Sequence, residues 1–135
     1  MIICGIELKA NNASLALVNS KGETSEYIES KQKKITIEDD ENIEDIAKFS
    51  NDIKELIDSY SIDKIVIKKR AKKGNFAGGA VTFKLEALIQ LNGICLVELL
   101  SSQTISKYQK KNDIEFPSKL NKYQEQAYLA ALCGA

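Results

Sequence analysis

A run of three β-branched residues, Ile65, Val66 and Ile67, does most to limit the folds open to this chain. An uninterrupted apolar run of this kind is typical of a strand covered on both faces. Helices must then supply the covering layers on either side of the sheet. The sequence therefore predicts an α/β protein.

The other segments supply the partners of this strand. Three strand segments separated by turn residues open the chain: residues 2–8 and 13–18 are apolar, and residues 23–29 alternate in the manner of a half-exposed edge strand. Four segments with helical periodicity follow, at residues 43–60, 80–91, 103–111 and 121–133. A last strand is expected at residues 94–100. The length of 135 residues predicts one domain over residues 1–135. Its five-stranded mixed sheet has three antiparallel strands, then parallel strands, with helices on both faces.

Composition removes several kinds of chemistry. The chain has 19 basic and 19 acidic residues, a balance that argues against a generally polycationic nucleic-acid binder. It has no histidine, which excludes Ser-His, Cys-His and His-ligated metal mechanisms. The three cysteines, Cys4, Cys95 and Cys133, lack the spacing of a zinc site or a disulfide framework. Carboxylates and lysines remain as the groups that could carry chemistry.

The N-terminal residues contain no basic leader region, and no apolar run approaches membrane-spanning length. We therefore expect a soluble, cytoplasmic protein without a membrane partner.

Positive charge is concentrated directly after the central strand. No acidic residue falls between Asp63 and Glu86, and the interval contains a glycine-rich basic segment. Such backbone is typical of phosphate-binding sites. The residues expected to contact nucleic acid are Lys68, Arg70, Lys72, Lys73, Gly74, Asn75, Phe76, Gly78, Gly79 and Lys84. The alternative is a solvated surface loop, in which Phe76 anchors the loop instead of stacking on an unpaired base.

Two resemblances to known families are carried by particular residues. The string Cys4-Gly5-Ile6-Glu7, followed by the apolar run 13–18, resembles the first strands of the ribonuclease H superfamily and its RuvC-like Holliday-junction resolvases. A closer resemblance, to an uncharacterised bacterial family, is carried by residues 66–87, residues 97–101 and Gln124-Glu125. It covers essentially the whole chain and implies a ribonuclease H-like fold. It implies no activity, because that family has no established one.

The resemblance to resolvases implies two-metal phosphodiester hydrolysis, in which carboxylates hold paired Mg²⁺ or Mn²⁺ ions. Glu7 and Glu125 match two of the required positions and are the expected catalytic residues and metal ligands. Lys69 stands where the closer family carries a carboxylate. Because an ammonium supplies no ligand oxygen, we expect a Glu7–Lys69–Glu125 salt-bridge group in place of the metal. Glu86 or Glu98 could complete a metal site only by facing the same cavity.

Three functional hypotheses follow from these observations. The first is a metal-dependent phosphodiesterase acting on structured DNA or RNA, weakened by its degraded carboxylate site. The second is a non-catalytic module of the same fold that binds nucleic acid or protein through the basic segment. The third, an actin-like phosphate binder, is disfavoured because no Walker-type motif is present. The exposed edge strand and the alanine-rich last helix are compatible with a homodimer.

Overall fold

The computed structural model of the protein describes residues 1–73 and 79–135. Six strands form one mixed sheet: β1 (Ile2–Lys9), β2 (Asn12–Lys21), β3 (Thr24–Ile28), β4 (Lys34–Thr36), β5 (Lys64–Lys68) and β6 (Leu96–Leu100). The helices are α1 (Ile43–Tyr60), α2 (Ala80–Gln90), α3 (Ser102–Lys111) and α4 (Glu125–Cys133), the last preceded by a 3₁₀ turn (Lys122–Gln124).

The strand order confirms the predicted mixed sheet. The strands run β3-β2-β1-β5-β6, with β2 antiparallel to β1 and β3, and with β5 and β6 parallel to β1. The sixth strand, β4, pairs with the first part of β2 and extends the expected five. Its three residues are too few to show a periodicity in the sequence.

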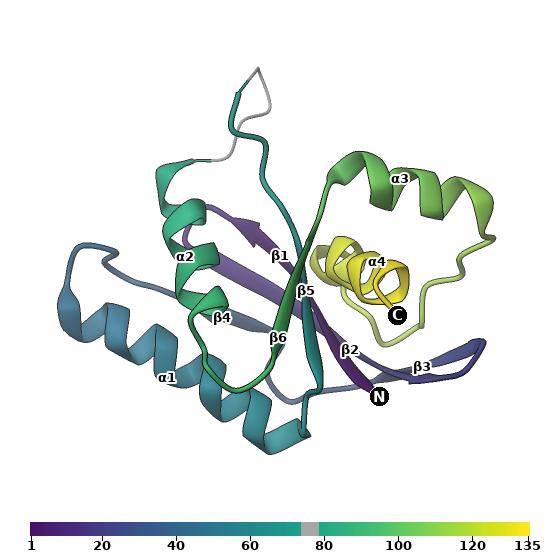
Figure 1. Cartoon of the computed structure of the whole chain (residues 1–135), viewed down its shortest axis with the longest axis horizontal. Helices are drawn as coiled ribbons and strands as arrows, with labels where there is room; N and C mark the ends of the chain where they lie inside the picture. Colours follow the sequence, from purple (N-terminus) through teal and green to yellow (C-terminus); the bar gives the residue numbers. More distant parts are fainter. Residues whose placement is uncertain (74–78) are drawn as a thin grey trace.

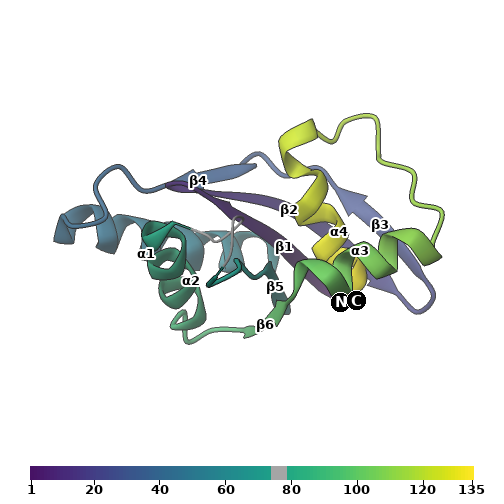
Figure 2. The same ribbon diagram turned by 90° about the horizontal axis from the view of Figure 1, so that it is seen from above.

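Helices cover both faces of the sheet, as predicted. Figure 1 shows α1 and α2 on one side of the strands and α3 and α4 on the other. Figure 2 shows the same layers from above, with the strands running between them. Each face has its own buried core, one that includes Phe49 and Ile53 of α1 and one that includes Ala127 and Ala131 of α4.

The residues at the two ends of α1 form hydrogen bonds with the backbone groups that the helix leaves unpaired. The Asn42 side chain accepts hydrogen bonds from the N–H groups of Glu44 and Asp45. At the other end, Ser61 adopts the left-handed conformation, with φ of 52°. Helix α1 therefore lies where the helical periodicity of residues 43–60 predicted a helix.

Helix α4 approaches the sheet more closely than ordinary side chains would allow. A Cβ atom added to Gly5 of β1 would lie 1.8 Å from the carbonyl oxygen of Ala127. Ala127, Ala130 and Ala131 are fully buried against the sheet. The alanine face of the last helix is therefore occupied within the chain, and it is not the dimer surface that the sequence suggested.

Gln124 sets where α4 begins. Its side chain is fully buried, accepts a hydrogen bond from the Asn121 N–H at 3.0 Å, and donates one to the Leu15 carbonyl of β2 at 2.9 Å. These contacts hold the N-terminus of α4 over the sheet.

Among the described residues, no helix combines the length and apolar character needed to cross a membrane.

Candidate functional site

The candidate site lies at the edge of the sheet where β1, β5 and β6 end, called here the carboxyl edge. These strands are parallel, so their C-terminal ends meet. In the β1–β5 register, Glu7 lies opposite Lys68. Ligands commonly bind at the carboxyl ends of parallel strands. Both residues are thus placed by backbone pairing at a position suited to a site.

Lys68 links the strands to α4. Its Nζ atom donates a hydrogen bond to Oε1 of Gln126 at 2.8 Å and lies 3.8 Å from Oε2 of Glu7. The side chains of Lys68 and Glu7 are only 21% and 19% exposed. Low exposure strengthens the attraction between the charges and makes an unpaired carboxylate costly there. Glu7 is therefore neutralised by an ammonium from its own chain.

The expected Glu7–Lys69–Glu125 group is wrong in its central member, because the lysine beside Glu7 is Lys68. The N–H of Lys69 bonds to the Leu100 carbonyl at 2.9 Å, which continues the β5–β6 pairing. Side chains alternate between the faces of a sheet, so Lys69 is directed away from the face that carries Lys68.

Glu86 of α2 lies near Lys69 rather than near Glu7. Its partial burial raises the pKa of the Glu86 carboxyl, while the charges of Lys72 and Lys69 lower it. Glu86 therefore belongs to the opposite face of the sheet from Gln126.

Glu98 is also separated from the carboxyl edge. It forms an ion pair of 3.0 Å with Lys64, at the start of β5. The Lys64 ammonium also donates to the carbonyl of Gly134, just beyond the C-terminal end of α4. Glu98 thus lies towards the opposite end of α4 from Gln126.

Glu125 is half-buried in the first turn of α4, next to Gln126. Gln126, one residue later in the helix, is the side chain that meets Lys68. Sequence reasoning missed Gln126, because an amide gave no signal of a metal or catalytic role. The 100° step between neighbouring helical residues decides which of the two faces the strands.

The residues around Glu7 do not fit a pair of divalent ions. Mg²⁺ requires oxygen ligands in near-octahedral geometry, whereas this position offers one carboxylate, one amide and an ammonium. Within residues 1–73 and 79–135, no three Asp, Glu, Cys or His side chains are grouped to hold a metal ion. The donor set therefore disagrees with two-metal chemistry.

A narrow basic cleft lies at the same edge. Lys69, Arg70 and Ala71 face Ser101, Ser102 and Gln103 across a space of about 60 Å³. The Nε atom of Arg70 is buried and has no hydrogen-bond partner in the described part of the chain. The facing residues begin α3, whose N-terminal N–H groups favour an anion. The geometry of the cleft suits a phosphate oxygen.

The predicted nucleic-acid contacts separate into several groups. Arg70, Lys72 and Lys73 follow β5 at the carboxyl edge, and Lys68 points towards Glu7 and Gln126. Lys84 of α2 is held instead by Asp40, through its carbonyl and an ion pair of 4.0 Å. Gly79 precedes the first residue of α2. Gly74, Asn75, Phe76 and Gly78 lie outside the described residues.

Sequence reasoning also missed the partner side of this cleft. Ser101 caps α3, and its hydroxyl accepts the Thr104 N–H at 3.1 Å. The parallel pairing of β5 and β6 offered the missing signal, because it brings the residue after each strand to the same edge.

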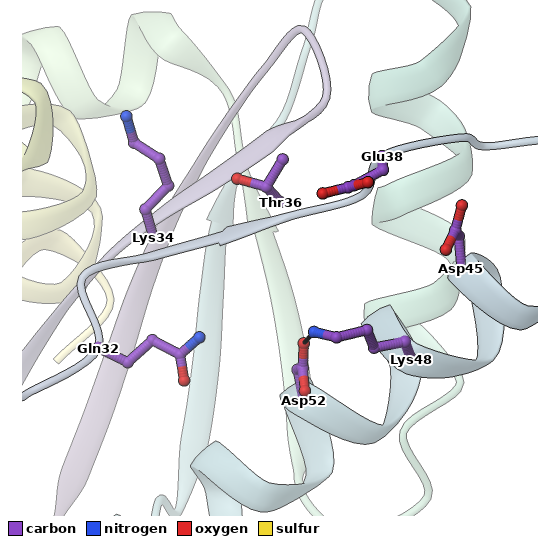
Figure 3. A pocket seen from close by; sticks show the side chains of 7 residues that line it. All are labelled: Gln32, Lys34, Thr36, Glu38, Asp45, Lys48 and Asp52. Carbon is purple, nitrogen blue, oxygen red and sulfur yellow. Dashed lines mark hydrogen bonds and ion pairs between the residues drawn. The ribbon is translucent and has the colours of Figure 1, made fainter.

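A larger cavity of about 450 Å³ lies elsewhere, between β4 and α1 (Figure 3). Lys48 and Asp52 form an ion pair of 2.9 Å in its wall. The Lys34 ammonium lies 4.4 Å from the centre of the Tyr123 ring. Because Lys48 is largely exposed and paired with Asp52, and Lys34 lies over Tyr123, the cations of this cavity are already engaged within the chain.

Solved structures of similar fold include two resolvases. Thermus thermophilus RuvC has a TM-score of 0.75 and 10% identity, over 98% of this chain and 92% of that one. The same protein in complex with a Holliday junction substrate has a TM-score of 0.75 and 9% sequence identity, and the match covers 98% of this chain and 91% of that one. Fowlpox virus resolvase with substrate Holliday junction DNA has a TM-score of 0.54 and 15% sequence identity, and the match covers 98% of this chain and 90% of that one. The TM-scores establish a RuvC-like, ribonuclease H-like fold, and identities this low establish nothing finer.

The sequence matches no curated protein. A family model described as "Protein of unknown function (DUF3010)" matches residues 1–134, and the chain therefore belongs to that family.

Proposed function

We propose that the protein binds nucleic acid at the carboxyl edge and does not cleave it by two-metal chemistry. The observation that carries this proposal is the position of the Lys68 ammonium, between Glu7 and Gln126. In this place a positive side chain neutralises the carboxylate that a metal ion would need. The carboxyl edge therefore presents a positive surface, and its carboxylate Glu7 is not available as a metal ligand.

Binding is supported by the basic residues and by the form of the cleft. Lys69 and Arg70 follow β5 and face the N-terminus of α3 across the cleft, and Lys72 comes two residues after Arg70. Cationic side chains and helix N-termini are the usual contacts of a phosphate backbone. Two proteins of similar fold were solved with Holliday junction DNA, so branched DNA is the first probe to use.

The test compares binding of a fluorescent four-way DNA junction and a linear duplex, measured by anisotropy between 50 and 200 mM salt. We expect binding that weakens steeply as salt rises, because released counterions drive phosphate contacts. The variant Lys69→Ala/Arg70→Ala/Lys72→Ala should flatten the logarithmic salt slope by about 0.9 for each phosphate that is no longer neutralised, up to roughly 3. A wild-type protein that binds neither DNA at 50 mM salt contradicts the proposal.

The matched control removes three lysines located elsewhere, as Lys21→Ala/Lys48→Ala/Lys54→Ala. Lys21 ends β2, which runs antiparallel to β1, and Lys48 and Lys54 belong to α1. The control has the same net charge as the edge variant. An equal loss of binding in both variants would show that total charge, and not the carboxyl edge, governs the contact.

A metal-dependent phosphodiesterase is the second candidate function. It is favoured by the placement of Glu7 and Glu125 at one edge, on β1 and in the first turn of α4. Incubation of the junction with wild-type protein and millimolar Mn²⁺ or Mg²⁺ distinguishes the two. Cleavage that Glu7→Gln abolishes establishes this candidate, whereas binding without products supports the first.

A further inference from the structure

A second surface lies at the opposite end of the parallel strands, where α2 turns into β6. Residues 87–97, between Glu86 and Glu98, contain no charged side chain. Three of their large aliphatic side chains are exposed: Leu91 by 78%, Ile94 by 49% and Leu96 by 71%. A group of this kind within six residues is unusual for a surface that meets only water.

The turn that carries these side chains is internally fixed. Asn92 is buried, and its amide donates to the carbonyls of Ile89 at 2.9 Å and Cys95 at 3.2 Å. Its Oδ1 accepts the N–H groups of Ile94 at 2.6 Å and Cys95 at 2.8 Å. Because the turn is already ordered, little conformational entropy is lost when Leu91 and Ile94 are covered.

The neighbouring strand β6 is the last in the order β3-β2-β1-β5-β6. The Leu100 carbonyl bonds to the N–H of Lys69, so Leu100 directs its backbone groups towards β5. Alternation along the strand then directs the N–H and C=O groups of Val97 and Leu99 towards the open edge. Open edges of this kind form hydrogen bonds with a further strand.

We propose that Leu91, Ile94, Leu96 and the open edge of β6, together called the β6 surface, bind a second copy of this chain. In a two-fold symmetric dimer, each copy contributes the same surface, which contacts its equivalent on the other copy. Residues 87–97 carry no charge, and the one carboxylate of β6, that of Glu98, is paired with Lys64 at 3.0 Å, so like-charge repulsion in such a contact is small. The formal net charge of +0 adds no long-range repulsion between copies. The basic carboxyl edge, by contrast, would repel itself.

The test measures the mass of the full chain by sedimentation between about 1 and 100 μM. We expect twice the 15.0 kDa chain mass at the upper concentrations. The variant Leu91→Lys/Leu96→Lys should raise the dissociation constant by roughly 30-fold or more, because it places four lysines at the contact. Both positions are exposed, so the fold should persist, and circular dichroism checks that it does.

The matched control is Ile43→Lys, which changes an aliphatic side chain that is 80% exposed at the start of α1. It should dimerise like the wild type. Concentration-dependent protection of the Val97 and Leu99 amides from hydrogen exchange would add support. The proposal is overturned by a monomeric wild-type protein at 100 μM, by a dimer that survives the double substitution, or by equal disruption from Ile43→Lys.

Discussion

The two faces of the sheet are packed by different means, and only one of them carries the contact of Lys68 with Glu7 and Gln126. On the α1–α2 face, large side chains such as Phe49, Ile53 and Ile67 fill the space between helix and strand. On the α4 face, Gly5 and Ala127 let the backbone of the helix approach the backbone of β1. The close approach brings Gln126 within hydrogen-bond distance of Lys68. Small residues on this face thus position polar groups, whereas large residues on the other supply apolar burial.

The largest expected effect tests the face built from large side chains. Phe49 is buried, so Phe49→Ala should lower the free energy of unfolding by about 4 kcal/mol through reduced apolar burial and a cavity. Urea denaturation measures the change, with the exposed Ile43→Ala as a control of little effect. A Phe49→Ala protein as stable as the wild type would mean that this face does not depend on filled volume.

The next effect tests the face built from close approach. Gly5→Ala should lower the free energy of unfolding by about 3 kcal/mol, because the added methyl overlaps the Ala127 carbonyl. Amides of α4 should then exchange faster than those of α1.

Gly79 offers a matched control for the close approach. A Cβ atom added there meets no atom of the described residues within 4 Å, so Gly79→Ala should lower the free energy of unfolding by less than about 1 kcal/mol at its helix-capping position. If Gly5→Ala and Gly79→Ala lower the free energy of unfolding equally, the close approach of α4 to β1 is not what stabilises that face of the sheet.

A smaller effect is expected from the polar contact that the close approach creates. Lys68→Met removes the cation beside a mostly buried Glu7 and should cost about 2 kcal/mol in thermal or urea unfolding. Adding Glu7→Gln should recover part of that loss, since the carboxylate no longer needs a partner.

Lys48→Met breaks the exposed pair with Asp52 and is the control for this prediction, with no measurable change expected. A loss in Lys68→Met that Glu7→Gln leaves unchanged would locate the role of Lys68 in packing rather than in charge.

The smallest effect concerns Glu86, which lies near Lys69 and Lys72 on the α2 side. Burial raises the pKa of Glu86 in the folded state. At pH values just above the ordinary pKa of a glutamate, the folded chain therefore binds more protons than the unfolded chain. Stability from this group is therefore present at acidic pH and falls as pH rises through the folded-state pKa. Glu86→Gln should remove that decline between the ordinary and raised values, as measured by unfolding midpoints across pH. An unchanged pH profile would show that Glu86 is effectively solvated.

Much of the fold follows from local patterns. The run Ile65-Val66-Ile67 predicted a strand covered on both faces, and all three residues are fully buried in β5. The periodicity of residues 43–60 predicted helix α1, whereas its cap, Asn42, was found only in the structure. Such signals depend on neighbours a few residues apart, so they can be recognised without the folded chain.

The candidate site was less accessible to the same reasoning. Both lysines at the end of β5 were known, yet the one beside Glu7 is Lys68 and not Lys69. A change of one residue in register reverses the face of every side chain in a strand. The role of Gln126 likewise depends on the rotation of α4 over β1 and β5.

Local sequence alone thus established the order and type of most elements, the lack of histidine chemistry and the basic segment after the central strand. The folded chain decided which charges meet: Lys68 with Glu7, Lys64 with Glu98, and the alanines of α4 with the sheet rather than with a partner. The physical reason is that element type depends on neighbours along the chain. A contact such as that between Lys68 and Gln126, 58 residues apart, depends on strand register, helix rotation and the space left by Gly5.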